Sequence, residues 1–182
     1  SSDNCRAPHF RTTQGLVEVM RSPRDAHPGA MARVGVVVVA AGAGQRMKGQ
    51  DKVFAPLLGV PAIVHAVEPF ECCLQVDYIV LVLAKENLQR GRDLIRHREW
   101  NKVVAVCLGG PRRQDSVQLG LSALPLCRWV LIHDGARPCV DVEIIQRGLM
   151  QVHGTGAAVA GIPVKDTVKL VSSEGVVQST LD

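Results

Sequence analysis

The sequence predicts an α/β domain built on a mostly parallel β-sheet. Apolar runs rich in β-branched residues alternate along the chain with segments in which apolar residues recur at helical spacing. Such alternation is typical of βαβ units, which have right-handed crossovers and a parallel sheet. The length of 182 residues suits one such domain, and an apolar content of 47% is enough for a buried core.

Five runs are predicted to be strands because they are dominated by Val, Ile, Leu and Ala, as expected for strands buried on both faces. These runs cover residues 34–41, 77–84, 102–108, 128–133 and 157–162. The first follows Met31 almost directly.

Four segments between these runs are predicted to be helices because their apolar residues fall on one face. They cover residues 61–70, 86–98, 114–124 and 142–152. Pro61 suits the first turn of its helix. Asp115 lies near the N-terminus of the third helix, and Asp141 suits the N-cap of the fourth.

Residues 1–30 differ from the rest of the chain. They hold prolines, arginines and histidines without a sustained helical or strand period. We expect translation to start natively at Met31, with residues 1–30 forming an upstream or disordered extension. A transit peptide is the alternative, but Asp3, Glu18 and Asp25 are unusual in that acid-poor class.

Composition excludes several classes of partner. The net charge of +4, from 21 basic and 17 acidic residues, is too small for a nucleic-acid coat but suits anionic small molecules. No apolar run approaches the ~20 residues that span a bilayer. The six cysteines include no C-x-x-C pair, and three lie in apolar stretches, as reduced core thiols do. We therefore expect a cytoplasmic protein with neither a nucleic acid nor a membrane as partner.

Three loops rich in glycine or charge follow predicted strands, at residues 40–52, 109–113 and 134–138. In parallel sheets, ligands gather at the carboxyl ends of the strands. The three loops are therefore expected to meet at one edge of the sheet.

The first loop reads Ala-Ala-Gly-Ala-Gly-Gln-Arg-Met over residues 40–47, with Lys52 five residues further on. Small residues allow a ligand to approach the backbone, whose N–H groups can surround phosphate oxygens. Arg46 and Lys52 add positive charge, so the loop predicts a nucleoside triphosphate site. No Walker motif is present, and Met47 replaces the third glycine of a dinucleotide fingerprint. The alternative is a tight turn with two solvated cations.

The second loop, Gly-Gly-Pro-Arg-Arg-Gln-Asp-Ser-Val over residues 109–117, leads into a predicted helix. Two glycines before a helix N-terminus allow a ligand to approach the backbone closely. The alternative is that Asp115 or Ser116 serves only as a helix cap.

The third loop reads His-Asp-Gly-Ala-Arg-Pro over residues 133–138. An acid directly after a buried strand is a suitable Mg²⁺ ligand when substrate phosphates complete the coordination, which points to Asp134. Arg137 suits a second anionic group. The alternative is a salt bridge between Asp134 and Arg137 that fixes the turn, and we expect His133 to be a packed, hydrogen-bonded side chain.

Together with Asp-Thr-Val-Lys at residues 166–169, these motifs resemble the 2-C-methyl-D-erythritol 4-phosphate cytidylyltransferases, within the pyrophosphorylase-type nucleotidyltransferases. The resemblance runs from about residue 34 to residue 182. It implies a Rossmann-like sheet of the nucleotide-diphospho-sugar transferase type over residues 31–163. It also implies a truncated β-arm over residues 164–182, which joins two subunits of a homodimer in this family.

The family's reaction joins CTP to the phosphate of 2-C-methyl-D-erythritol 4-phosphate, releases pyrophosphate and uses Mg²⁺, as a step of non-mevalonate isoprenoid biosynthesis. By resemblance, the catalytic cations are Arg46 and Lys52. The residues implied to bind CTP are Ala40, Ala41, Gly42, Gly44, Gly110, Arg113 and Ser116. Those implied to bind the second substrate are Arg137, Asp166 and Thr167, and Asp134 is implied to hold the metal.

The chain departs from the family pattern in two places. Residue 51 is Asp where relatives often have Pro, which bears on how Lys52 is presented. The family's arginine past the arm, its Thr-Pro-Gln stretch and its late Asn-Ile-Lys motif do not occur. We therefore expect a fragment of a longer product that binds CTP weakly and turns over little or not at all.

Two alternatives to this function stay open. Ribitol-5-phosphate cytidylyltransferases share the framework, although they tend to have Val where this chain has Ala136. An inactive nucleotide-binding fragment is the other.

Overall fold

The structure, a computed structural model, describes residues 10–13, 17–20, 33–42 and 51–181. The chain divides into two units, residues 1–146 and residues 147–182.

The first unit contains four parallel strands, which confirm four of the five predicted strands. They are β3 (Val34–Ala40), β6 (Tyr78–Leu83), β7 (Val103–Leu108) and β8 (Trp129–Asp134). Their order in the sheet is β7-β6-β3-β8. The chain therefore builds outward from β3 on one side and then returns past it to form β8. Ligands of such sheets bind where the order reverses, at the carboxyl ends of β3 and β8.

All four predicted helices are present. They are α1 (Ala62–Cys72), α2 (Leu88–Arg98), α3 (Arg113–Ala123) and α4 (Val142–Thr155), and a short 3₁₀ helix (η3, Lys85–Asn87) precedes α2. The predicted cap of α4 is confirmed, because Ile144 N–H donates to Asp141 Oδ1 at 2.7 Å.

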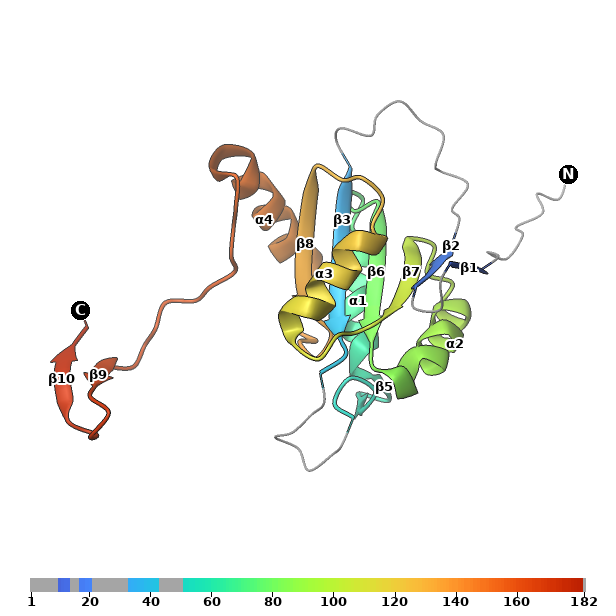
Figure 1. Ribbon diagram of the computed structural model, residues 1–182. Coiled ribbons are helices and arrows are strands. Elements are labelled where there is room, and N and C mark those ends of the chain that lie inside the picture. Colours follow the sequence, from blue (N-terminus) through green and yellow to red (C-terminus); the bar gives the residue numbers. More distant parts are fainter. Residues whose placement is uncertain (1–9, 14–16, 21–32, 43–50, 182) are drawn as a thin grey trace, which may run out of the picture. The chain divides into compact units, whose positions relative to one another are not determined.

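The helices cover both faces of the sheet, with α3 in front of it and α1 behind it (Figure 1). A Cβ on Gly120 of α3 would lie 2.3 Å from a methyl carbon of Val37, so this helix packs tightly on β3. On the α1 side, Ile63, Phe70 and Val38 are almost fully buried. This two-sided burial explains why β3, β6 and β7 are continuous apolar runs. Strand β8, which was expected to be buried on both faces, is partly exposed.

Two short strands lie within residues 1–30, where the sequence shows no sustained strand period. Strands β1 (Phe10–Thr13) and β2 (Val17–Met20) form a hairpin, and β2 pairs antiparallel with β7. Without β2, β7 would be an edge strand with a row of unpaired backbone groups. Main-chain hydrogen bonds can add a strand there without an apolar period. The assignment of residues 1–30 as an extension stays a prediction.

The prediction of a strand at residues 157–162 was wrong, because the structure is irregular there. A strand needs a partner for its backbone groups. In the second unit the described strands β9 (Lys169–Val171) and β10 (Val177–Thr180) pair with each other, as an antiparallel hairpin within the predicted arm.

The first unit contains another small hairpin, formed by β4 (Pro56–Leu57) and β5 (Val60–Pro61), which precedes α1. Among the described helices, none has the length and hydrophobicity that crossing a membrane requires.

Candidate active site

The second and third loops both meet the end of β3, from which the first loop starts, so the described part of the predicted junction lies at the carboxyl edge of the sheet. A Cβ on Gly109 would lie 2.1 Å from the Cβ of Ala41, and one on Gly135 would lie 2.8 Å from the Cβ of Ala40. The second and third loops therefore both pack against the end of β3, and only glycine permits this approach. Gly42 is exposed, and a Cβ on it would meet no atom of the described residues within 4 Å.

Asp134 is the last residue of β8, and its carboxylate contacts two guanidinium groups. Arg113 donates to Oδ1 through Nε at 2.9 Å and lies 2.8 Å from the same oxygen through Nη2. Arg137 Nε lies 3.1 Å from Oδ2. The alternative of an Asp134–Arg137 salt bridge is thus present in the structure, and Arg113 adds a second partner that the sequence did not indicate.

The register of the sheet explains how Arg113 reaches Asp134. Asp134 lies beside Val39 of β3, and Val39 belongs to the core cluster that packs with Val117 of α3. The Asp134 side chain therefore faces α3, whose first residue is Arg113.

His133 points to the opposite face of the sheet, as alternation along a strand requires. Its ring contacts Phe70 of α1, and its Nε2 donates to the carbonyl oxygen of Arg137 at 3.0 Å. Burial lowers the pKa of the His133 imidazole below its ordinary value. The prediction of a packed, hydrogen-bonded histidine is confirmed.

The buried side chain of Ser116 forms a hydrogen bond with the backbone of the second loop. Its side chain is buried, with 2% of the residue exposed, and Gly110 N–H donates to its Oγ at 3.1 Å. The cap of α3 is formed instead by Asp115, which accepts from the backbone N–H of Arg112 at 3.1 Å and pairs with its guanidinium. That guanidinium lowers the pKa of the Asp115 carboxyl. Asp115 is thus a cap, whereas Ser116 fixes the loop that is predicted to bind CTP.

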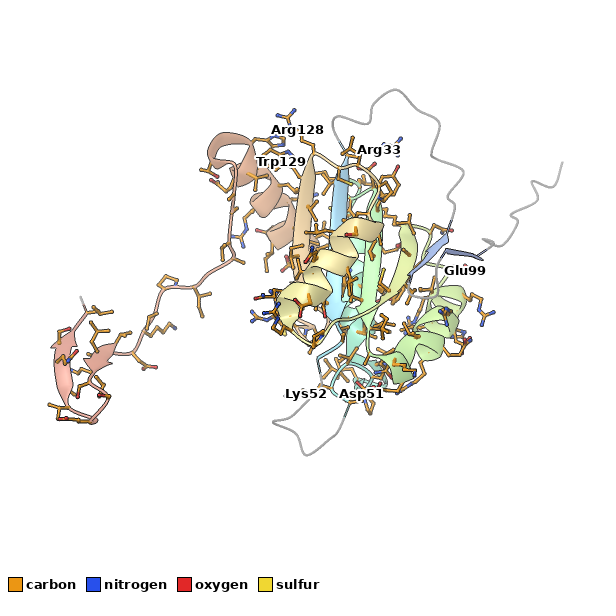
Figure 2. All side chains as sticks on the ribbon, in the orientation of Figure 1. Arg33, Asp51, Lys52, Glu99, Arg128 and Trp129 are labelled. Carbon is orange, nitrogen blue, oxygen red and sulfur yellow. The ribbon has the colours of Figure 1, made fainter. Side chains whose placement is uncertain are left out.

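Lys52 lies at the end of the sheet opposite Arg33, next to Asp51 (Figure 2). Because Arg33 precedes β3, this is the end at which β3 stops and against which the second and third loops pack. Arg46 and Gly44 lie outside the described residues, so their part in the site stays a prediction. Asp51 forms an ion pair with Arg90, which the sequence analysis did not predict. The available signal was an Asp two residues before a buried apolar pair, which is typical of a turn.

Asp166 and Thr167 lie in the second unit, on the segment that precedes β9. Their predicted contact with the second substrate stays a prediction.

The donor set around Asp134 restricts the kind of metal it could hold. Among the described residues, no three His, Cys, Asp or Glu side chains form a metal-binding group. A single carboxylate suits Mg²⁺, which keeps several waters and takes further ligands from substrate phosphates. The residues present therefore fit a cation that arrives with a polyphosphate.

The sequence matches known proteins along most of its length. Residues 34–182 match the family model described as IspD, 2-C-methyl-D-erythritol 4-phosphate cytidylyltransferase. A relative of that name from Dehalococcoides mccartyi strain CBDB1 is 48% identical over 149 residues, covering 82% of this chain and 66% of the relative. One from Clostridium acetobutylicum is 36% identical over 148 residues, covering 80% and 65%. The chain thus spans just under two thirds of the length of these curated relatives.

Solved structures share the fold. A 4-diphosphocytidyl-2C-methyl-D-erythritol synthase from Anaerococcus prevotii superposes with a TM-score of 0.72 at 24% identity, covering 82% of this chain and 64% of that one. The 2-C-methyl-D-erythritol 4-phosphate cytidylyltransferase of Francisella tularensis gives a TM-score of 0.62 at 26% identity, covering 82% and 66%. The predicted fold class is confirmed, and the chain belongs to the 2-C-methyl-D-erythritol 4-phosphate cytidylyltransferase family.

Proposed function

We propose that the protein acts as a cytidylyltransferase, which transfers the cytidylyl group of CTP to the phosphate of 2-C-methyl-D-erythritol 4-phosphate. Membership of the family supports this function. The observation that carries it is the junction at the end of β3, where Ala41 meets Gly109 and where Asp134 gathers Arg113 and Arg137. Small residues beside two cations and one carboxylate suit a polyphosphate with its metal.

The reaction needs no covalent enzyme intermediate. A phosphate oxygen of the acceptor attacks the α-phosphorus of CTP, a new P–O bond forms, and the bond from the α-phosphorus to the bridging oxygen breaks to release pyrophosphate. The protein contributes position and positive charge. Lys52 and Arg113 would hold phosphate oxygens, with Arg46 as a predicted third cation.

The remaining residues orient the two substrates. The backbone at Ala41 and Gly42, with the loop that Ser116 fixes at Gly110, would bind the nucleoside. Arg137 would hold the acceptor phosphate. Asp134 would hold Mg²⁺ together with phosphate oxygens, and the cation would neutralise charge on the departing pyrophosphate.

The protein is further proposed to be a cytoplasmic homodimer. The five described cysteines are free thiols, which is usual in a reducing compartment. The β9–β10 hairpin carries apolar side chains that are half-exposed within its own unit, among them Leu170 at 49% and Val177 at 55%. Such side chains suit contact with a second copy.

Calorimetric titration with CTP, UTP, GTP and ATP in the presence of Mg²⁺ tests the nucleotide part of this proposal. CTP is expected to bind more tightly than the other three, and equal binding of all four would contradict it. Pyrophosphate release with 2-C-methyl-D-erythritol 4-phosphate or ribitol 5-phosphate as acceptor then tests the second substrate. A preference for ribitol 5-phosphate would overturn the proposed acceptor.

A further inference from the structure

Asp51 uses both of its carboxylate oxygens, and each serves a different part of the fold. Oδ1 accepts from the backbone N–H groups of Val53 at 3.1 Å and Phe54 at 3.4 Å, which closes a turn around Lys52. Oδ2 accepts from Arg90 Nη1 of α2 at 3.2 Å, across 39 residues of sequence. The carboxylate therefore ties the turn that contains Lys52 to a helix.

Arg90 is itself held by two further groups. Its guanidinium carbon lies 4.3 Å from the centroid of the Phe54 ring, and its Nη1 lies 3.3 Å from Asn87 Oδ1. Phe54 and Asn87 are both buried, at 8% and 4% exposed. A planar guanidinium stacked on a buried ring has little freedom to turn. Arg90 is thus a rigid partner for Asp51.

The other side of the same turn is fastened to α1. The carbonyl oxygen of Val53 accepts from Ile63 N–H at 2.9 Å, and that of Ala55 accepts from Ala62 N–H at 2.9 Å. The backbone around Lys52 is therefore fixed to two helices. Within the described part of the chain, the Lys52 ammonium has no carboxylate partner, so its charge remains available to a ligand.

The negative charge of Asp51 beside Lys52 is unfavourable for phosphate binding, so its presence there requires an explanation. A carboxylate next to a phosphate-binding lysine repels phosphate, and the Asp51–Arg90 pair is too exposed, at 34% and 54%, to add much stability. The pair neutralises the repulsion, and its hydrogen bonds fix the direction of the chain at Lys52. These observations favour a role in geometry over one in stability.

We propose that Asp51 is a positioning residue, which through Arg90 holds Lys52 where it meets the phosphates of the bound nucleotide. The inference rests on the proposed function, in which Lys52 binds the triphosphate. It predicts an effect on triphosphate affinity opposite to the one that charge alone would give. Removing the negative charge of Asp51 is expected to weaken triphosphate binding, whereas simple electrostatics predicts that binding strengthens.

The test measures CTP affinity with Mg²⁺ by calorimetry for the wild type, Asp51→Ala, Lys52→Ala and the double variant. Asp51→Ala is expected to weaken CTP binding about 3- to 10-fold, in the range of moderate coupling energies between contacting residues. In the Lys52→Ala background, the same change is expected to have little effect. Tighter binding by Asp51→Ala, or an equal loss in both backgrounds, would overturn the positioning role. If Lys52→Ala leaves CTP affinity unchanged, the proposed role of Lys52 fails and this inference fails with it.

Two more variants separate the link to Arg90 from folding. Asp51→Asn keeps an acceptor for the turn but cannot accept from Arg90 with its amide nitrogen, so it is expected to behave like Asp51→Ala. Wild-type affinity in Asp51→Asn would overturn the role of Arg90. Asp93→Ala is the matched control, because it breaks an exposed ion pair with Arg96 on the same helix. It is expected to leave CTP affinity unchanged, and urea unfolding of each variant shows that the fold is retained.

Discussion

Arg113 donates to Asp134 Oδ1 through Nε at 2.9 Å, and its Nη2 lies 2.8 Å from the same carboxylate oxygen. The second oxygen of Asp134 faces Arg137. A cation that binds Asp134 must therefore compete with guanidinium groups. Competition of this kind disfavours binding of the cation alone, and it leaves an arginine free for phosphate oxygens once the cation and nucleotide bind together.

Replacing Arg113 with Gln is expected to strengthen binding of Mn²⁺ to the free protein. The gain is about 1.4- to 5-fold, since an exposed ion pair contributes roughly 0.2–1 kcal/mol. The same variant is expected to bind CTP more weakly, because it loses a phosphate ligand. The amplitude of the free-Mn²⁺ EPR signal measures the first effect, and calorimetry measures the second.

Arg112→Gln is the control for this prediction, because Arg112 is the neighbouring residue but pairs with Asp115. It is expected to leave Mn²⁺ affinity unchanged. If both variants bind Mn²⁺ as the wild type does, the guanidinium groups do not compete with the cation.

Ser116→Ala is expected to lower the free energy of unfolding by about 1–3 kcal/mol, the cost of leaving a half-buried donor without its acceptor. The donor is Gly110 N–H, which lies 3.1 Å from Ser116 Oγ. Urea unfolding measures the loss. Ser122→Ala in the same helix is the control. Its stability is expected to change little, because Ser122 is exposed and its hydroxyl donates to the carbonyl oxygen of Gln118 within the same helix. Equal effects at both serines would contradict the role of Ser116.

Gly109→Ala is expected to separate the second loop from the end of β3. The new Cβ would lie 2.1 Å from Ala41 Cβ, and neither atom belongs to a side chain that can turn away. Overpacking of this kind costs about 1–3 kcal/mol. We expect a lower urea midpoint together with weaker CTP binding. Gly148→Ala is the control, because its Cβ would meet no side chain of the described residues within 4 Å, and a helical alanine is expected to stabilise. A Gly109→Ala protein with wild-type stability would show that the loops can move apart freely.

Hydrophobic period was sufficient to predict the four parallel strands and the four helices, although only β3, β6 and β7 among these strands are almost entirely buried. Hydrophobic period failed where the formation of a strand depends on a neighbouring strand for its backbone hydrogen bonds. Strand β2 exists because β7 offers an edge, and residues 157–162 stay irregular although their composition resembles that of a strand. Neither outcome is encoded in local spacing.

The site was predictable to a similar depth. Motif order placed Asp134, Arg137 and Gly109 at one edge of the sheet, as the structure shows. The contact of Arg113 with Asp134 depends on which face of β8 the carboxylate occupies and on where α3 begins. The link from Asp51 to Arg90 likewise depends on how α2 packs. Side-chain pairs of this kind follow from tertiary packing, which a single sequence does not specify.

Acid is expected to destabilise the protein through His133, because burial lowers its pKa in the folded state. The unfolded chain then binds a proton at a higher pH, near the ordinary histidine pKa of about 6.5. Below that pH the unfolded state holds more protons than the folded state, so the free energy of unfolding falls as pH drops toward the folded pKa, by at most about 1.4 kcal/mol per pH unit.

His133→Gln tests this prediction, because glutamine keeps a nitrogen that can donate to the carbonyl of Arg137 but does not titrate. It is expected to lose stability overall, because the contact with Phe70 is lost, and to show a flatter dependence on pH. Urea unfolding at pH 5, 6 and 7 measures both effects, and parallel curves for the two proteins would show that His133 is not the group responsible.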